Sequence, residues 1–179
     1  SVPFPYNKLP FDVCHEWPRL WQQNMSQINH ILPRSNVFFD LDVGSKKRVF
    51  EQVGLLLENS EKLSRSTVFD SLFARERLGS TGLGHGVAIP HGRIKGLREA
   101  VGVLIRLKQP ILFDAPDGKP VSLLFVLLVP DQATDLHLQL LSELAQLFSS
   151  KALREKLLNA PDAETLYQLV ADWGQNATG

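Results

Sequence analysis

The longest apolar run in the chain, residues 121–129, limits the possible folds more than any other feature. Only Ser122 interrupts the run, and Pro130 ends it. It is too short to cross a bilayer as a helix, which needs about 20 apolar residues. A run that is apolar on both sides suits a strand covered on both faces, as in α/β proteins. Residues 100–107 have the same character, so we expect two central strands.

Helical and strand-like patterns alternate around these two strands. Residues 37–43 are rich in residues that favour strands, and they predict a first strand. Thr67, with Asp70 three residues later, resembles a capping box and marks the start of a helix. Strands interleaved with helices indicate a three-layer α/β domain. Apolar residues at helical spacing predict helices over residues 45–59, 67–78, 135–149, 151–159 and 162–173.

The first 24 residues differ from the rest of the chain. They hold four prolines and five aromatic residues and follow no helix or strand period. Met25 is the only methionine, which favours it as the natural start, with residues 1–24 derived from cloning or upstream translation. The alternative is a natural N-terminal arm that packs its aromatic side chains on the domain or a neighbour. In both cases residues 25–179 form the predicted domain.

Composition excludes several classes of function. Lysine plus arginine and aspartate plus glutamate both number 19, so no overall field attracts nucleic acid or an anionic membrane. The single cysteine, Cys14, cannot form an intramolecular disulfide and fits a reducing compartment. No signal peptide is recognisable, because residues 1–24 lack an apolar core segment. We therefore expect a cytoplasmic protein without membrane insertion.

His91 is the strongest candidate for a reactive group, within the run Gly-Val-Ala-Ile-Pro-His-Gly at residues 86–92. Pro90 fixes its own φ and restricts the residue before it, so the backbone entering His91 is stiff. Gly92 has no side chain and leaves room for a large partner or a phosphoryl group. The apolar residues before Pro90 place His91 at the end of a buried strand. An imidazole there, with an ordinary pKa of about 6.5, can act as a nucleophile.

Three further features surround this candidate. His137 is expected in the first turn of the helix over residues 135–149, with Thr134 as N-cap, where anions are favoured. Arg75 lies near the end of the helix over residues 67–78, where it could neutralise phosphoryl charge or stabilise the helix end. Residues 79–86 contain four glycines and predict a loop. The candidate phosphoryl-binding residues are Gly79, Ser80, Thr81 and Gly92.

Other interpretations of these residues remain open from their chemistry alone. His91 could be an ordinary strand-end histidine, and His137 a water-exposed histidine at a helix start. The glycine-rich segment matches neither a phosphate-binding Gly-Lys-Ser/Thr loop nor a dinucleotide fingerprint. His85, His91 and His137 are the available metal ligands, but no His-Glu-x-x-His motif or cysteine pair supports them. We expect neither a nucleotide cofactor nor a metal site.

Together these residues resemble a known family. Residues 75–82 (Arg-Glu-Arg-Leu-Gly-Ser-Thr-Gly), residues 86–92, the strand at 123–130 and the pair at 137–138 resemble enzyme IIA domains of the bacterial phosphoenolpyruvate-dependent phosphotransferase system. Within these domains the chain resembles the mannitol/fructose type, and most of all the nitrogen-regulatory enzyme IIA. The similarity covers about residues 28–173. It implies a three-layer α/β/α fold with a mixed central sheet, and activity without nucleotide or metal.

The resemblance also implies roles for individual residues. His91 corresponds to the phosphorylated histidine, His137 to the second active-site histidine that supports the phosphoryl group, and Arg75 to the arginine beside them. The implied relay runs from phosphoenolpyruvate to enzyme I, then to an HPr-like histidine phosphocarrier protein, then to His91. The chain would be a phosphotransferase component with a phosphohistidine intermediate and a mainly regulatory role.

Three functions remain open at this point. A nitrogen-type regulator would control regulatory target proteins through its phosphorylation state. A sugar-specific IIA component would pass the phosphate to a IIB domain. A binding module of another class would never be phosphorylated on His91. The run at residues 75–81, and the lack of a IIB cysteine domain or membrane segments in this sequence, favour the regulator.

Overall fold

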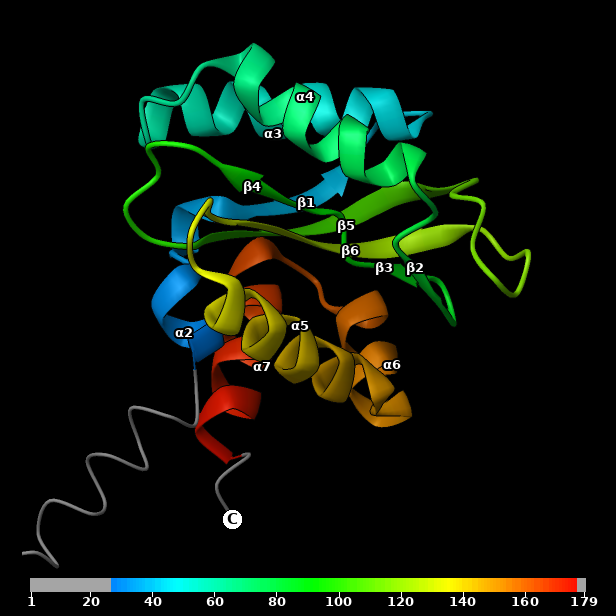
Figure 1. Cartoon of the computed structure of the whole chain (residues 1–179). Coiled ribbons are helices and arrows are strands. Elements are labelled where there is room, and N and C mark those ends of the chain that lie inside the picture. Colours follow the sequence, from blue (N-terminus) through cyan, green and yellow to red (C-terminus); the bar gives the residue numbers. More distant parts are fainter. Residues whose placement is uncertain (1–26, 177–179) are drawn as a thin grey trace, which may run out of the picture.

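A computed structural model describes residues 27–176 of the chain. A sheet of six strands lies between two layers of helices (Figure 1). The strand order is β1-β5-β6-β3-β2, and β4 also pairs with β6. The predicted three-layer α/β/α fold is confirmed. The predictions for residues 1–24 and for Met25 lie outside the described residues.

The sheet is mixed, as the resemblance implied. Strands β5 and β6 are antiparallel, whereas β1 runs parallel to β5, and β3 and β4 run parallel to β6. Strand β2 is antiparallel to β3. Strands β3 and β4 therefore follow one another along the same side of β6. The strands are β1 (Val37–Leu41), β2 (Gly82–Gly84), β3 (Val87–Ala88), β4 (His91–Ile94), β5 (Val101–Ile111) and β6 (Val121–Pro130).

The helices divide between the two faces of the sheet. Helices α3 (Lys46–Ser60) and α4 (Arg65–Arg77) cover one face (Figure 1). The other face is covered by α2 (Gln27–Ile31), α5 (Thr134–Ser149), α6 (Lys151–Asn159) and α7 (Ala163–Asn176), and a short 3-10 helix, η2 (Arg34–Asn36), precedes β1. No helix within residues 27–176 has the length and apolar character needed to span a membrane.

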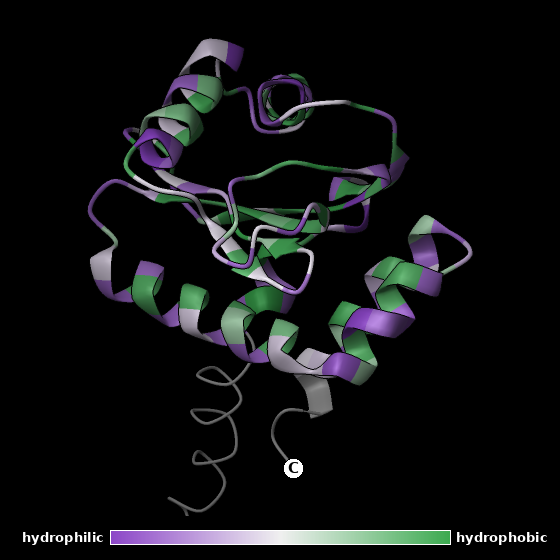
Figure 2. Ribbon diagram, turned by 90° about the vertical axis from the view of Figure 1, so that its right-hand side faces the viewer, coloured by the Kyte–Doolittle hydropathy of each residue, from purple (hydrophilic) through white to green (hydrophobic). Residues whose placement is uncertain are grey.

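Strand β6 explains why the apolar run at residues 121–129 has no polar side. Leu124, Val126 and Leu128 pack into the core beneath α3 and α4. Phe125 and Leu127 point the other way, into the core formed with α2, α5, α6 and α7. Successive side chains of a strand alternate between faces, and here both faces are covered. In Figure 2 the central strands are mostly green, whereas the helices alternate green and purple, as amphipathic helices do.

The start of α4 differs from its prediction. The helix begins at Arg65, and Ser64 is the N-cap in an extended conformation. Val68 N–H donates to the Ser64 carbonyl at 3.1 Å, so Thr67 already lies within the first turn. The capping box proposed at Thr67 is therefore wrong, because the chain takes its helical conformation two residues earlier.

The glycine-rich segment at residues 79–86 was predicted to be a loop, and this prediction is wrong for part of it. Its second half forms strand β2 and a tight turn into β3. Gly84, His85 and Gly86 have φ angles of 89°, 56° and 77°. Glycine adopts positive φ at no steric cost, which permits so sharp a turn. The remaining loop, residues 78–81, lies directly after α4.

Candidate functional site

His91 is the first residue of β4, not the last residue of the preceding strand. Strand β3 stops at Ala88, and Pro90 has no N–H with which to continue the ladder. The Pro90 carbonyl still accepts a hydrogen bond from Leu127 N–H at 2.9 Å, which holds the segment against β6. The prediction that His91 ends a buried strand is therefore wrong in detail. It begins a new strand on the same side of β6.

The protonation of the His91 ring follows from its hydrogen bond. Nδ1 of His91 lies 2.7 Å from the carbonyl oxygen of Ile89. A carbonyl oxygen can only accept, so Nδ1 carries the proton and donates it. In the neutral ring the other nitrogen, Nε2, then holds the lone pair. Nε2 is thus the nucleophilic atom of His91.

Gly92 is buried against helix α4. A Cβ atom at this position would collide with the Ser71 side chain. Ser71 Oγ also donates to the Arg93 carbonyl at 3.0 Å. Glycine at position 92 therefore allows α4 to approach β4 closely, and Ser71 fills the space that we expected a phosphoryl group to use.

His137 lies on α5 and faces His91. The ring centroids are 5.2 Å apart, and the ring planes meet at 70°. Helix α5 begins at Thr134 with Ala133 as N-cap and no side-chain cap, so the prediction of Thr134 as N-cap is wrong. The His137 N–H is already bonded to the Ala133 carbonyl at 3.0 Å. Its side chain, and not its backbone, is what His137 contributes to the site.

The proton of the neutral His137 ring lies on the other nitrogen from that of His91. Nε of Arg93 donates to Nδ1 of His137 at 3.4 Å. Nδ1 therefore holds the lone pair, and Nε2 carries the proton. Nε2 of His137 is buried and has no hydrogen-bond partner among the described residues. One ring of the pair offers a lone pair, and the other offers an N–H donor.

Sequence reasoning missed Arg93, although a signal was present. Residues two apart in a strand point to the same face, so Arg93 lies on the same face of β4 as His91. A cation two residues after a candidate nucleophile, in a strand, could have been identified from the sequence.

Burial and nearby charge keep both rings neutral. The pKa of His91 is lowered from 6.5, mainly by burial and also by the positive charge of Arg75. The Ile89 hydrogen bond and the negative charge of Glu76 act in the opposite direction. The pKa of His137 is lowered as well, first by burial and then by the charges of His91, Arg93 and Arg75. A neutral His91 keeps its lone pair available at neutral pH.

Arg75 lies in the last turn of α4 and anchors the loop that follows. Its Nη1 donates to the Gly79 carbonyl at 2.9 Å. The guanidinium is close enough to both histidines for its charge to lower both pKa values. The structure thus brings together His91, His137 and Arg75 as the sequence predicted, and adds Arg93.

The polar side chains of the predicted phosphoryl-binding loop already have partners. Ser80 Oγ donates to the Phe113 carbonyl at 2.7 Å. Thr81 Oγ1 and N–H donate to the two carboxylate oxygens of Glu76, at 2.6 and 3.2 Å. Nζ of Lys46 bonds the same carboxylate at 2.9 Å. We call Glu76, Thr81 and Lys46 the Glu76 cluster. Sequence reasoning did not single out Glu76, which is buried.

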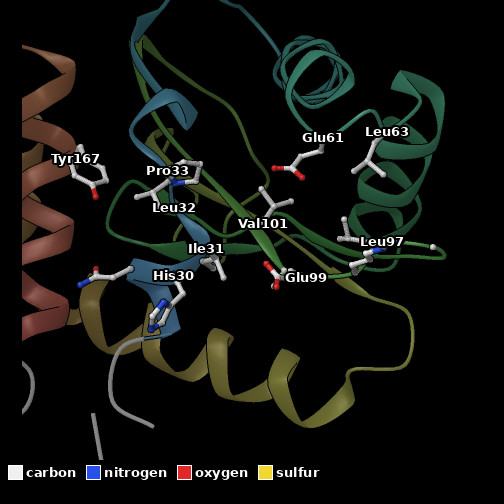
Figure 3. A pocket seen from close by; sticks show the side chains of 14 residues that line it. His30, Ile31, Leu32, Pro33, Glu61, Leu63, Leu97, Glu99, Val101 and Tyr167 are labelled. Carbon is white, nitrogen blue, oxygen red and sulfur yellow. The ribbon is translucent and has the colours of Figure 1, made fainter. Parts of the chain in front are cut away.

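The remaining candidates lie elsewhere. His85 occupies the turn between β2 and β3, where its N–H donates to Asp117 at 2.9 Å. Within residues 27–176, no group of three or more His, Cys, Asp or Glu side chains could hold a metal ion. A cavity of about 620 Å³ is lined by α2, residues 96–101 and Tyr167, and neither His91 nor His137 lines it (Figure 3).

Comparisons with known proteins show which family this chain is similar to. The sequence profile of the family "Phosphoenolpyruvate-dependent sugar phosphotransferase system, EIIA 2" matches residues 30–173. A nitrogen regulatory protein of Pseudomonas aeruginosa is 44% identical over 149 residues, which cover 83% of this chain and 97% of that protein.

Solved structures of enzyme IIA proteins are also similar to this chain. The crystal structure of nitrogen regulatory protein IIA-Ntr from Neisseria meningitidis is 56% identical, with a TM-score of 0.77, over 81% of this chain and 99% of that one. The complex of enzyme IIAMTL and phosphorylated enzyme IIBMTL from Escherichia coli has a TM-score of 0.68 at 18% identity, over 79% of this chain and 99% of that one. At that identity the likeness concerns the fold alone.

Proposed function

The chain belongs to the EIIA 2 family of the phosphoenolpyruvate-dependent sugar phosphotransferase system, and we propose that it is a phosphoryl-relay regulator whose acceptor is His91. A histidine phosphocarrier protein is the proposed donor. The observation that carries this proposal is the complementary protonation of two facing rings. The His91 ring, whose lone pair is on Nε2, lies beside a ring whose Nε2 has no partner among the described residues.

The proposed step is a transfer between two imidazoles. The lone pair of His91 Nε2 attacks the phosphorus of the carrier's phosphohistidine, and a new P–N bond forms. The old P–N bond breaks, and its electron pair stays on the carrier's histidine. Positive charge develops on the His91 ring while Nδ1 keeps its proton, and the Ile89 carbonyl stabilises that charge by accepting a hydrogen bond from Nδ1–H.

The neighbouring residues supply positioning and charge. We propose that His137 Nε2–H donates to a phosphoryl oxygen on His91, and that the charge of Arg75 offsets the negative charge that arrives. Catalysis of phosphoryl transfer consists mainly of such positioning and electrostatic stabilisation. The hydroxyls of Ser80 and Thr81 already donate within the fold, and so do the N–H groups of Gly79 and Thr81. We therefore propose that these groups of the loop at residues 78–81 shape the site and do not bind the phosphoryl group.

The regulatory branch is favoured by the relatives. The Pseudomonas aeruginosa relative, 44% identical, and the Neisseria meningitidis structure, 56% identical, are both described as nitrogen regulatory proteins. By this proposal, the phosphorylation state of His91 controls target proteins. The second candidate is a sugar-specific component, which the family's description includes and which would pass its phosphate to a IIB domain. We propose that either form acts in the cytoplasm, together with a donor system that starts from phosphoenolpyruvate.

Reconstitution of the relay tests the acceptor. Purified protein is incubated with enzyme I, the phosphocarrier and phosphoenolpyruvate, and acid-labile phosphate is measured. We expect labelling of the wild type and of His85→Ala, a control in an exposed turn, and no labelling of His91→Ala. Unlabelled wild-type protein would leave only the function of a binding module.

Two further measurements refine the proposal. Transfer from purified phosphorylated carrier is expected to proceed in EDTA, because neither a metal nor a nucleotide takes part in the proposed step. Addition of a IIB domain then separates the branches. Rapid loss of label to IIB indicates the sugar-specific component, whereas retention of label indicates the regulator.

A further inference from the structure

Arg93 is the charged residue that contacts the histidine pair directly. We propose that Arg93 is a positioning residue that fixes His137 with its proton on Nε2, and so decides which of the two histidines accepts the phosphoryl group. This inference rests on the proposed role of His91 as acceptor. It assigns to Arg93 a function in selecting the acceptor, separate from contact with the phosphoryl group.

The strand places Arg93 where this contact is possible. Gly92 and Ile94 of β4 are buried, and Gly92 lies against Ser71 on α4. His91 and Arg93 alternate with them and therefore point to the opposite face, toward α5. Arg93 is exposed, so its side chain reaches His137 from the solvent side while the ring remains half-buried.

An arginine partner determines the tautomer without ambiguity. A guanidinium has five N–H donors and no acceptor, and it does not lose its charge in proteins. The ring nitrogen that meets Nε of Arg93 must therefore hold a lone pair. In the neutral ring the proton then lies on Nε2, the buried atom that has no partner among the described residues. A carboxylate in the place of Arg93 would hold the proton on Nδ1 instead.

The consequence is a difference between two rings that are otherwise alike. With centroids 5.2 Å apart, both rings lie close to an incoming phosphoryl group. His91 presents a lone pair at Nε2, because its proton is held on Nδ1 by Ile89. His137 presents a proton at Nε2, because Arg93 occupies its lone pair at Nδ1. The first ring can form a P–N bond, and the second can only donate a hydrogen bond.

Nitrogen NMR of the full chain with isotope-labelled histidine tests the tautomer in the unphosphorylated protein. We expect His137 of the wild type to be unprotonated at Nδ1 and protonated at Nε2. Arg93→Met removes the donor, and we expect a mixture of both tautomers. Arg93→Lys keeps a charged side chain with N–H donors and no acceptor, and is expected to retain the Nε2–H form.

Transfer rates complete the experiment. Arg93→Met is expected to slow transfer from the phosphorylated carrier about tenfold, the size of effect found when a group that orients a functional histidine is removed. Arg93→Lys should recover most of that rate. Lys95→Met, which removes a neighbouring exposed charge, is the matched control and should resemble the wild type in both measurements. Circular dichroism establishes that each variant is folded.

The outcomes separate this inference from the proposed function. An unchanged His137 tautomer in Arg93→Met, even with slow transfer, would overturn the inference and assign Arg93 to the phosphoryl group itself. A wild-type His137 with its proton on Nδ1 would overturn it directly. If the tautomer shifts as expected but the wild type accepts no phosphate, the effect of Arg93 on His137 stands and the relay fails.

Discussion

Two polar clusters lie near each other in this protein, and they differ in whether their polar groups have hydrogen-bond partners within the chain. In the Glu76 cluster, both carboxylate oxygens, the Thr81 hydroxyl and the Lys46 ammonium find partners within the chain. In the histidine pair, the buried Nε2 of His137 has none among the described residues. Native proteins satisfy most buried polar groups, so an exception calls for an explanation. The comparison assigns structure to the first cluster and function to the second.

The Glu76 cluster also explains why the loop after α4 is well defined. Glu76 joins the end of α4 to Thr81, and Lys46 at the start of α3 joins the same carboxylate. Arg75, the preceding residue, bonds the Gly79 carbonyl from the other side of the loop. Adjacent residues of α4 thus differ in what they contact. Glu76 connects α4 with Thr81 and Lys46, and the charge of Arg75 acts on the histidine pair.

The largest effect on stability is expected for Glu76→Ala. This change leaves the Thr81 hydroxyl without its acceptor, and it leaves the Lys46 ammonium with only the exposed Asp114 carboxylate at 3.3 Å. We expect a loss of about 3 kcal/mol in the free energy of unfolding. Chemical denaturation measures it. Glu76→Gln is the matched variant: it keeps an acceptor for Thr81 and should lose less. Equal stability of Glu76→Ala and wild type would contradict the structural role of the Glu76 cluster.

A smaller effect, on rate alone, is expected for His137→Ala. Loss of the Nε2–H donor should slow phosphoryl transfer about 100-fold, as when one preorganised donor is removed from an active site. Circular dichroism and the unfolding free energy should change little, because no polar partner within the core depends on this ring. His137→Gln, whose amide can donate, should recover part of the rate. An unchanged rate in His137→Ala would remove the residue from the mechanism.

Thr81→Val tests the boundary between the two clusters. It removes a hydroxyl that donates to Glu76, and we expect a loss of about 1 kcal/mol in stability. The transfer rate should stay within about twofold of wild type, since the hydroxyl is already engaged. Stopped transfer with unchanged stability would restore Thr81 to the phosphoryl-binding group.

The smallest expected effect is a dependence of stability on pH. The folded-state pKa values of His91 and His137 lie below the unfolded value of 6.5, chiefly because of burial. Protonation therefore favours the unfolded chain, and the contribution of these rings to stability is complete above pH 6.5. It is lost as pH falls from 6.5 through the folded pKa values. Denaturation of wild type and of the His91→Ala/His137→Ala double variant should diverge in this range, and parallel curves would contradict the pKa directions.

Much of the fold follows from the sequence because its strongest signals are periodic. The run at residues 121–129 predicts a strand covered on both sides, and β6 is one. The boundaries of α4 and of the glycine-rich hairpin did not follow, because they depend on backbone angles at Ser64 and at residues 84–86. Local patterns do not determine such angles.

The sequence predicted three residues of the histidine site, but neither Arg93 nor the hydrogen bonds. His91, His137 and Arg75 come from three separate elements, and their meeting follows from the family resemblance. The sequence marks Gly92 as special, yet the reason is contact with Ser71, a long-range neighbour. That contact depends on tertiary packing. The Thr81 hydroxyl is engaged by Glu76, only five residues earlier, and that contact depends on the path of the loop between them.

The central claim is that Nε2 of His91 is the acceptor atom. Phosphorus and nitrogen NMR of the phosphorylated, isotope-labelled protein tests it most directly, because coupling between phosphorus and a ring nitrogen identifies the bonded atom. The account predicts coupling to Nε2 of His91, with the Nδ1 proton still donated to Ile89. Coupling to Nδ1 of His91, or to either nitrogen of His137, would contradict it.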